Sequence, residues 1–200
     1  MAIINTEVTE DGVIFHPETI QSEPITVEKK YPGTRITFDV SLDSIRKTLT
    51  IDVGFGDVIT PHPIDMDYPV IFDDSDEINL VAYSLETLVA EKFQTMIDRS
   101  VTNSRMKDFF DLYRILSVHQ FDTDILQEAI NATFTNRNTA YSPNHSLFED
   151  DFKQDRGMTM QWNNYLKKMK LPQDRSFAEV VDFITGKLKP HWEKLSTNEI

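Results

Sequence analysis

SLETLVAEKFQTMIDRS, residues 84–100, is the stretch that most decides the fold of this chain. Its apolar side chains recur with the 3.6-residue period of a helix, and Ser84 stands where an N-cap residue is preferred. Lys92 is expected in the middle of the apolar face, between Leu88 and Met96. Burying a lysine costs several kcal/mol unless it is paired or takes part in chemistry. The stretch therefore predicts a packed helix over residues 85–99 with a paired or functional lysine.

The next segment, RMKDFFDLYRIL over residues 105–116, predicts a second helix, which we expect to span about residues 105–119. Its apolar face is formed by Phe109, Leu112 and Leu116. Asp108 borders this face, and Asp111 lies further toward solvent. Opposite charges on two facing helices indicate a site, and Lys92 and Asp108 are its candidate residues.

The first third of the chain has the period-two alternation of strands. Asp52 lies in one of them, on the face opposite to Leu49 and Ile51. Carboxylates on one face of a sheet can hold Mg²⁺, which prefers hard oxygen ligands; equally, Asp52 can be an ordinary exposed strand residue. Pro24 places its strand at a sheet edge. The predicted strands are residues 13–15, 20–31, 35–42, 47–56 and 68–72.

The second half of the chain reads as helical. Beyond the first two helices, we expect helices over residues 124–133, 158–170 and 177–189, with Pro190 ending the last one. Residues 134–157 are expected to be polar and irregular, and residues 73–77 to form an acidic loop. The fold class is thus α+β, with a β-rich part over residues 1–82 and a helical part over residues 83–200. We expect the two parts to form one compact unit.

Composition narrows the functional classes. The 200 residues include no cysteine, which excludes disulfides and thiolate metal sites, and the five histidines show no zinc-ligand spacing. No apolar run is long enough to span a membrane, and no signal peptide is recognisable, so a cytoplasmic location is expected. The net charge of −13 argues against general coating of nucleic acid. From Lys153 onward, however, nine Lys and Arg residues stand against six Asp and Glu residues, a net +3.

Three motifs together resemble a known family. They are IDVGFGDVITP (residues 51–61), YSLETLVAEKFQTMIDR (residues 83–99) and RMKDFFDLYRIL (residues 105–116). The chain resembles, over nearly its whole length, the AbiEii/AbiGii-type nucleotidyltransferase toxins of bacterial abortive-infection and toxin–antitoxin systems. The resemblance implies a nucleotidyltransferase-like mixed or antiparallel sheet followed by a helical region.

The resemblance also implies a function and roles for residues. Family members use Mg²⁺ and a nucleoside triphosphate, and some transfer nucleotides to RNA such as tRNA ends, in type IV-like toxin–antitoxin or phage-defence systems. A cognate antitoxin is the implied protein partner. Asp52 would match the sheet carboxylate and candidate metal ligand, and Lys92 the catalytic or triphosphate-binding lysine. Asp108 would match the essential aspartate, which orients the triphosphate or acts as a base.

One motif of the family is missing from this sequence. The family opens with a Gly-Ser turn followed by an Asp-x-Asp pair that holds the metal ions, whereas Gly12 and Gly33 are followed by other residues. Asp65-Met66-Asp67 has the spacing, but we expect it in a proline-rich turn. The chain as given is therefore expected to be inactive, because phosphoryl transfer depends on its metal ions. An open sheet edge could allow homo-oligomers to form.

Two alternatives remain open at this point. The chain could be a catalytically dead nucleotidyltransferase fold that binds a partner protein. Lys92 and Asp108 could also form a structural ion pair in an unrelated α+β domain. A lysine and an aspartate that only neutralise each other on packed helices are weak evidence for catalysis.

Overall fold

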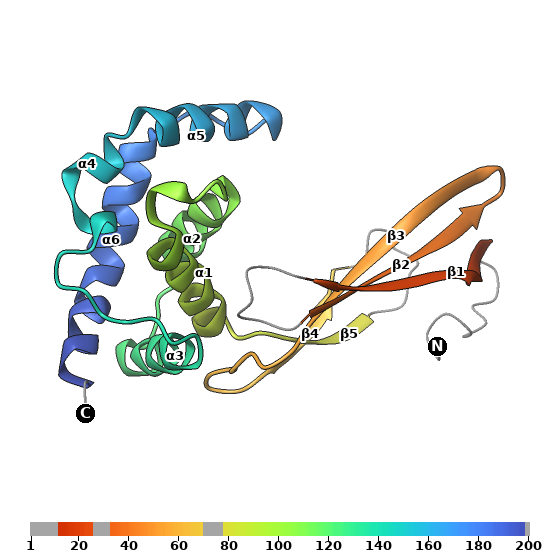
Figure 1. Ribbon diagram of the computed structural model, residues 1–200, viewed down its shortest axis with the longest axis horizontal. Coiled ribbons are helices and arrows are strands. Elements are labelled where there is room, and N and C mark those ends of the chain that lie inside the picture. Colours follow the sequence, from red (N-terminus) through yellow and green to blue (C-terminus); the bar gives the residue numbers. More distant parts are fainter. Residues whose placement is uncertain (1–11, 26–32, 70–77, 199–200) are drawn as a thin grey trace. The chain divides into compact units, whose positions relative to one another are not determined.

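The computed structural model describes residues 12–25, 33–69 and 78–198 (Figure 1). Antiparallel strands come first and helices follow, which confirms the predicted α+β class. The chain divides into two compact units, Met1–Asp57 and Val58–Ile200, described separately below. The strands end at Ala82 and the first helix begins at Leu85. The division into parts at residues 82 and 83 stays a prediction.

The first unit contains a three-stranded antiparallel sheet (Figure 1). Its strands are β1 (Val13–Ile25), β2 (Gly33–Leu42) and β3 (Ile45–Gly54), in the order β1-β2-β3. β1 joins the predicted strand at residues 13–15 to the start of the one at 20–31, across an irregularity between His16 and Gln21. Residues 26–31 lie outside the described residues. The edge position predicted from Pro24 is confirmed.

One face of this sheet is apolar and the other is polar. On the apolar face Phe38 is buried and its ring centroid lies 6.1 Å from that of Phe15. Leu49 and Ile51 share that face, yet remain 42% and 47% exposed, so the predicted burial of this face holds only in part. The polar face carries cross-strand ion pairs, including one made by Asp52.

The second unit begins with a hairpin-like pair of short strands, β4 (Ile64–Tyr68) and β5 (Ile78–Ala82). Of the predicted strand at residues 68–72, Tyr68 is the last residue of β4 and Pro69 follows it outside the strand. Residues 70–72 lie outside the described residues, so that part stays a prediction. Just before β4, Thr60 is anchored to the first helix. Its backbone N–H donates to Thr87 Oγ1 at 2.8 Å, and its carbonyl accepts from the hydroxyls of Ser84 and Thr87.

The helices begin and end close to the predicted residues. The helix predicted at residues 85–99 has those bounds, with Ser84 as its N-cap accepting from the N–H of Thr87 at 3.1 Å. The segment 134–157, expected to be irregular, also contains a short 3-10 helix at Ser146–Phe148 and the short helix α4. The bounds are α1 (Leu85–Arg99), α2 (Met106–Val118), α3 (Thr123–Asn136), α4 (Asp150–Lys153), α5 (Arg156–Lys168) and α6 (Phe177–Lys194). Within the described residues, no helix has the length and apolar character needed to cross a membrane.

Aromatic side chains form the centre of the helical core. The Trp192 ring of α6 lies 6.4 Å from Phe93 of α1 and 5.8 Å from Phe134 of α3, measured between centroids. Trp192 is 1% exposed, and its indole N–H donates to the carbonyl of Ser142 at 3.1 Å. Phe152 of α4 is also buried. The segment 134–157 is therefore polar in composition but contributes buried side chains.

The prediction that Pro190 ends the last helix is wrong. α6 continues to Lys194 with Pro190 inside it (Figure 1). A proline within a helix costs about 3 kcal/mol, because it removes one hydrogen bond and crowds the preceding turn. Residues on both sides of it, Leu188 and Trp192, are buried. Burying a large apolar side chain stabilises by roughly 1.5–3 kcal/mol, so packing against the core outweighs the local penalty.

Gly186→Ala is expected to stabilise the second unit. Gly186 lies within α6, and a Cβ added there meets no heavy atom within 4 Å. Alanine has a helix propensity about 1 kcal/mol better than glycine, and the free energy of unfolding, measured with urea, should rise by about that amount. Gly157→Ala in α5 is the matched control. Its Cβ would lie 3.1 Å from Asp155 Oδ1, so it should gain less. An equal or smaller gain at Gly186 would contradict this account.

Candidate functional site

Lys92 lies beside the most deeply buried face of α1. That face is formed by Val89, Phe93 and Met96, all fully buried. The Lys92 side chain is 14% exposed, so it lies at the border of the apolar face. The sequence had predicted a position at the centre of that face. The residue one turn before it, Leu88, is likewise only partly buried. The stem of Lys92 therefore packs against neighbouring side chains while its ammonium reaches the next helix.

The ammonium of Lys92 is held between two carboxylates of α2. Its Nζ lies 2.7 Å from Asp108 Oδ1 and 2.8 Å from Asp111 Oδ2. The two aspartates are three residues apart, so they lie on one face of α2. Lys107 also donates to Asp111 Oδ2, at 2.6 Å. The predicted meeting of Lys92 with Asp108 is therefore present, and Asp111 is a second partner that the sequence had placed further toward solvent. We call Lys92, Asp108 and Asp111 the Lys92 site.

Hydrogen bonds keep Lys92 and Asp111 ionised although both are partly buried. Burial alone would lower the pKa of Lys92, but the hydrogen bonds to Asp108 and Asp111 outweigh it and leave the pKa raised. Burial alone would raise the pKa of Asp111, but hydrogen bonds from Lys107 and Lys92 leave it lowered. Near neutral pH, Lys92 is therefore an ammonium and Asp111 a carboxylate. The pKa of Tyr165 in α5 is raised, first by burial and then by the negative charge of Asp111.

A second polar cluster, which the sequence interpretation missed, fixes α1 against the end of α3. Arg137 Nη2 lies 2.6 Å from Glu91 Oε1, and Arg137 Nη1 donates to Gln94 Oε1 at 2.9 Å. The amide nitrogen of Gln94 in turn donates to Thr139 Oγ1 at 2.8 Å. Glu91 directly precedes Lys92, so these contacts hold the backbone of the lysine in place. The only signal in the sequence was a second charged residue, Glu91, beside the apolar face of the helix.

Asp52 belongs to the first unit and Lys92 to the second, so the surroundings of Asp52 are described within the first unit. Asp52 lies opposite Arg35 in the β2–β3 register, and both its oxygens accept from that guanidinium, at 2.8 and 2.9 Å. This contact lowers the pKa of Asp52, first through the hydrogen bond and also through the positive charge. Its role as a sheet carboxylate of the active site stays a prediction.

The residues around Asp52 do not fit a Mg²⁺ site. Magnesium needs carboxylate oxygens that are free to enter its coordination shell, whereas both oxygens of Asp52 are engaged by Arg35. In the described part of the chain, no group of three or more His, Cys, Asp or Glu side chains is placed to hold a metal ion.

Asp65-Met66-Asp67 lies in a strand, which corrects the expectation of a proline-rich turn. The three residues are part of β4, where Asp65 pairs with Val81 and Asp67 with Asn79. Pairing with β5 extends this backbone although prolines precede and follow it. Asp65 and Asp67 point to the same side of the strand because side chains alternate, and Asp67 Oδ1 accepts from Asn79 Nδ2 at 3.3 Å.

Comparison with known proteins yields one match. The family model described as "Nucleotidyl transferase AbiEii toxin, Type IV TA system" matches residues 1–183. Neither the curated proteins nor the solved structures contain a match to the chain. The match includes all the residues of the Lys92 site.

A double-mutant cycle should show that Lys92 and Asp108 are strongly coupled. We expect Lys92→Met and Asp108→Asn, alone and combined, to give a coupling energy of about 1–3 kcal/mol in urea unfolding, because the pair is largely shielded from water. The control cycle is Lys153→Met with Asp182→Asn. This pair has a similar separation of 2.8 Å but is 26% and 58% exposed, so its coupling should be clearly weaker. Equal coupling energies in the two cycles would show that burial does not strengthen the interaction between Lys92 and Asp108.

Proposed function

The chain belongs to the family of AbiEii nucleotidyl transferase toxins of type IV toxin–antitoxin systems, and we propose on that premise that its Lys92 site binds the triphosphate of a nucleoside triphosphate. The family implies such a substrate, together with an antitoxin as partner. The observation that carries the proposal is the Lys92 ammonium, which two aspartates hold in a fixed place while 14% of the side chain remains exposed.

Lys92 has the chemistry that a triphosphate requires. A lysine ammonium acts as a compact point charge with three donors, and at the border of a packed helix it is less screened than in water. Its raised pKa keeps it cationic when the substrate arrives. Asp108 and Asp111 act as positioning residues here, since they hold the ammonium between α1 and α2 through contacts of 2.7 and 2.8 Å.

The reaction that fits the family, in a member that has the metal-binding Asp-x-Asp pair, is nucleotidyl transfer to a hydroxyl group. The acceptor oxygen forms a bond to the α-phosphorus, the bond from that phosphorus to the bridging oxygen breaks, and pyrophosphate leaves. The acceptor loses its proton to a base. In this proposal Asp108 either orients Lys92 on the triphosphate or accepts that proton. Lys92 stabilises the negative charge that develops on the leaving phosphates.

We propose RNA, such as a tRNA end, as the acceptor. The charge of the chain is uneven: the residues from Lys153 onward carry a net +3, which leaves −16 for the residues before them. Lysines of α5 and α6 contribute most of this positive charge, and such a surface can contact phosphates. The acidic remainder limits binding to this region and disfavours general coating of nucleic acid.

We further propose that the chain of 200 residues binds the nucleotide but does not transfer it. It contains no Gly-Ser turn followed by Asp-x-Asp, and Asp52 would have to release Arg35 before it could ligate Mg²⁺. Asp65 and Asp67 have the Asp-x-Asp spacing on a strand, but no Gly-Ser turn precedes them. Efficient phosphoryl transfer depends on metal ions that neutralise the phosphates.

A second candidate function is a protein-binding module that keeps the fold without catalysis. Ile45, Leu49 and Ile51 favour it, since these side chains of β3 are 59%, 42% and 47% exposed. Contiguous apolar side chains on a surface are typical of protein interaction sites. A module of this kind would bind its partner whether or not Lys92 is intact, which separates it from the nucleotide-binding proposal.

Nucleotide binding should depend on Lys92 and not on an ion-paired lysine outside the Lys92 site. We expect Lys92→Met to weaken binding of a labelled nucleoside triphosphate at least tenfold, because it removes the charge that meets the phosphates. Lys153→Met is the matched control, since Lys153 is also ion-paired, with Asp150 and Asp182 at 2.8 Å, but lies outside the Lys92 site, and it should change binding little. Circular dichroism would check that both variants are folded. Unchanged binding by Lys92→Met would contradict the proposed role of Lys92.

The same chain should show no metal-dependent transfer of labelled nucleotide to RNA. The assay incubates the chain with Mg²⁺, each α-labelled nucleoside triphosphate and total tRNA, and follows the label on a denaturing gel. Label on the RNA that disappears with Lys92→Ala would refute the proposed inactivity while supporting the site. Label that survives Lys92→Ala would refute the role of Lys92 as well.

A further inference from the structure

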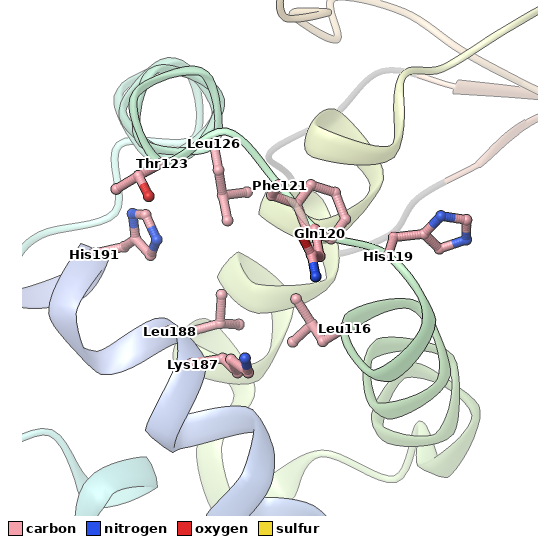
Figure 2. Close-up of a pocket in the computed structure, with 9 residues that line it drawn as sticks. All are labelled: Leu116, His119, Gln120, Phe121, Thr123, Leu126, Lys187, Leu188 and His191. Atoms are coloured by element: carbon pink, nitrogen blue, oxygen red, sulfur yellow. The ribbon is translucent and has the colours of Figure 1, made fainter.

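A pocket of about 400 Å³ lies at the C-terminal end of α2, between that end and the start of α3 on one side and α6 on the other (Figure 2). Asp108 and Asp111 lie in the first half of α2, so this pocket is separate from the Lys92 site. Three buried leucines form its apolar floor: Leu116, Leu126 and Leu188. The volume is in the range of pockets that hold small organic molecules.

His191 lines this pocket, and only one of its two ring nitrogens has a hydrogen-bond partner in the described part of the chain. The residue is 8% exposed, and its Nδ1 lies 2.8 Å from Gln127 Oε1. The amide nitrogen of Gln127 donates to Asn131 Oδ1 and to the carbonyl of His191, so the Gln127 oxygen must accept. Nδ1 therefore carries the proton. Burial, and then the charge of Lys194, lower the pKa of His191, so the ring is neutral near pH 7. Its Nε2 is then a lone-pair acceptor, with no hydrogen-bond partner in the described ranges of the chain.

Lys187 supplies a positive charge one turn before His191 on the same helix. Residues four apart lie on the same face of a helix, and Figure 2 shows both side chains at the pocket. The ammonium of Lys187 lies 6.0 Å from the centroid of the Phe183 ring. Within the residues that the structure describes, it makes no ion pair, so it is available to an anion.

The charge around the pocket favours a single negative charge on the ligand. Asp122, the N-cap of α3, accepts from the N–H groups of Asp124 and Ile125, so its carboxylate already occupies the positive end of this helix. Asp122 and Asp124 would repel a polyphosphate or a nucleic acid strand. Lys187 is then the group left to pair with an anion.

We propose that this pocket binds a small organic monoanion with an apolar body and one N–H or O–H donor. The donor bonds to Nε2 of His191, the apolar body covers the three leucines, and the anionic group pairs with Lys187. The donor and the anionic group of the ligand thus meet a ring nitrogen without a hydrogen-bond partner and an ammonium without an ion-pair partner in the described part of the chain. No chemical step is involved, and the site would act in addition to the Lys92 site.

Indole-3-acetate is a suitable probe because it combines an indole N–H, an apolar ring and a carboxylate. We expect saturable binding to the full chain in titrations followed by ¹H–¹⁵N NMR, with a dissociation constant of about 1 mM or tighter, as ligands of this size reach. The shifts should centre on the end of α2, residues 119–121, the start of α3 and the last turns of α6. Lack of saturation at about 5 mM, or shifts centred elsewhere, would overturn the proposal.

Two further comparisons test the individual contacts. The analogue methylated on the indole nitrogen cannot donate to Nε2, and it should bind roughly tenfold more weakly, the usual effect of one lost hydrogen bond at a buried acceptor. Lys187→Gln should weaken binding of indole-3-acetate several-fold, whereas the control Lys189→Gln should not, since Lys189 lies over the Phe148 ring and does not line the pocket. Both lysines are exposed, so folding should be retained. Equal binding by the analogue, or equal effects of the two variants, would contradict the proposed contacts.

Discussion

A positive charge that is largely removed from water dictates the arrangement of the first two helices. Lys92 can remain an ammonium only if acidic groups stay within hydrogen-bond distance, because burial by itself favours its neutral form. Asp108 and Asp111 meet that condition, at 2.7 and 2.8 Å. A shift of α2 along α1 would leave the charge unpaired at a cost of several kcal/mol. The ion pairs therefore fix the register of the two helices more sharply than apolar packing alone would.

Apolar packing decides what lies around this pair. Trp192 contacts side chains from α1 and α3 as well as the segment that follows α3, so α6 is held against the core along its last turns. The helix continues through Pro190 for this reason. The structure thus agrees with the local conformational preference of a residue where that preference permits burial of large side chains. At Pro190, burial of the neighbouring large side chains outweighs the preference of proline to end a helix.

The predictable part of the molecule was the part encoded in local periodicity. The bounds of α1 and the meeting of Lys92 with Asp108 follow from the 3.6-residue pattern, since the pattern places residues on helix faces. The contacts of Arg137 with Glu91 and of Thr60 with Thr87 join residues 46 and 27 positions apart, and periodicity carries no information about such pairs. Residues 65–67 were expected in a turn because prolines flank them, while pairing with β5 makes them a strand. Tertiary partners, which a single sequence does not display, account for these differences.

Asp111 differs from Asp108 in that it serves two lysines, Lys92 and Lys107, through the same oxygen. If Lys92 turns toward a triphosphate, Lys107 can remain on that oxygen, so Asp111 is not left as an uncompensated anion beside the incoming phosphates. Lys107 thus acts as a resident counter-ion that lets Lys92 change partners at a lower electrostatic cost. The ion pair between Lys107 and Asp111 on the surface of α2 resembles an ordinary solvent-exposed pair. Its consequence is that Lys92 can leave Asp111 for a phosphate without leaving that carboxylate unpaired.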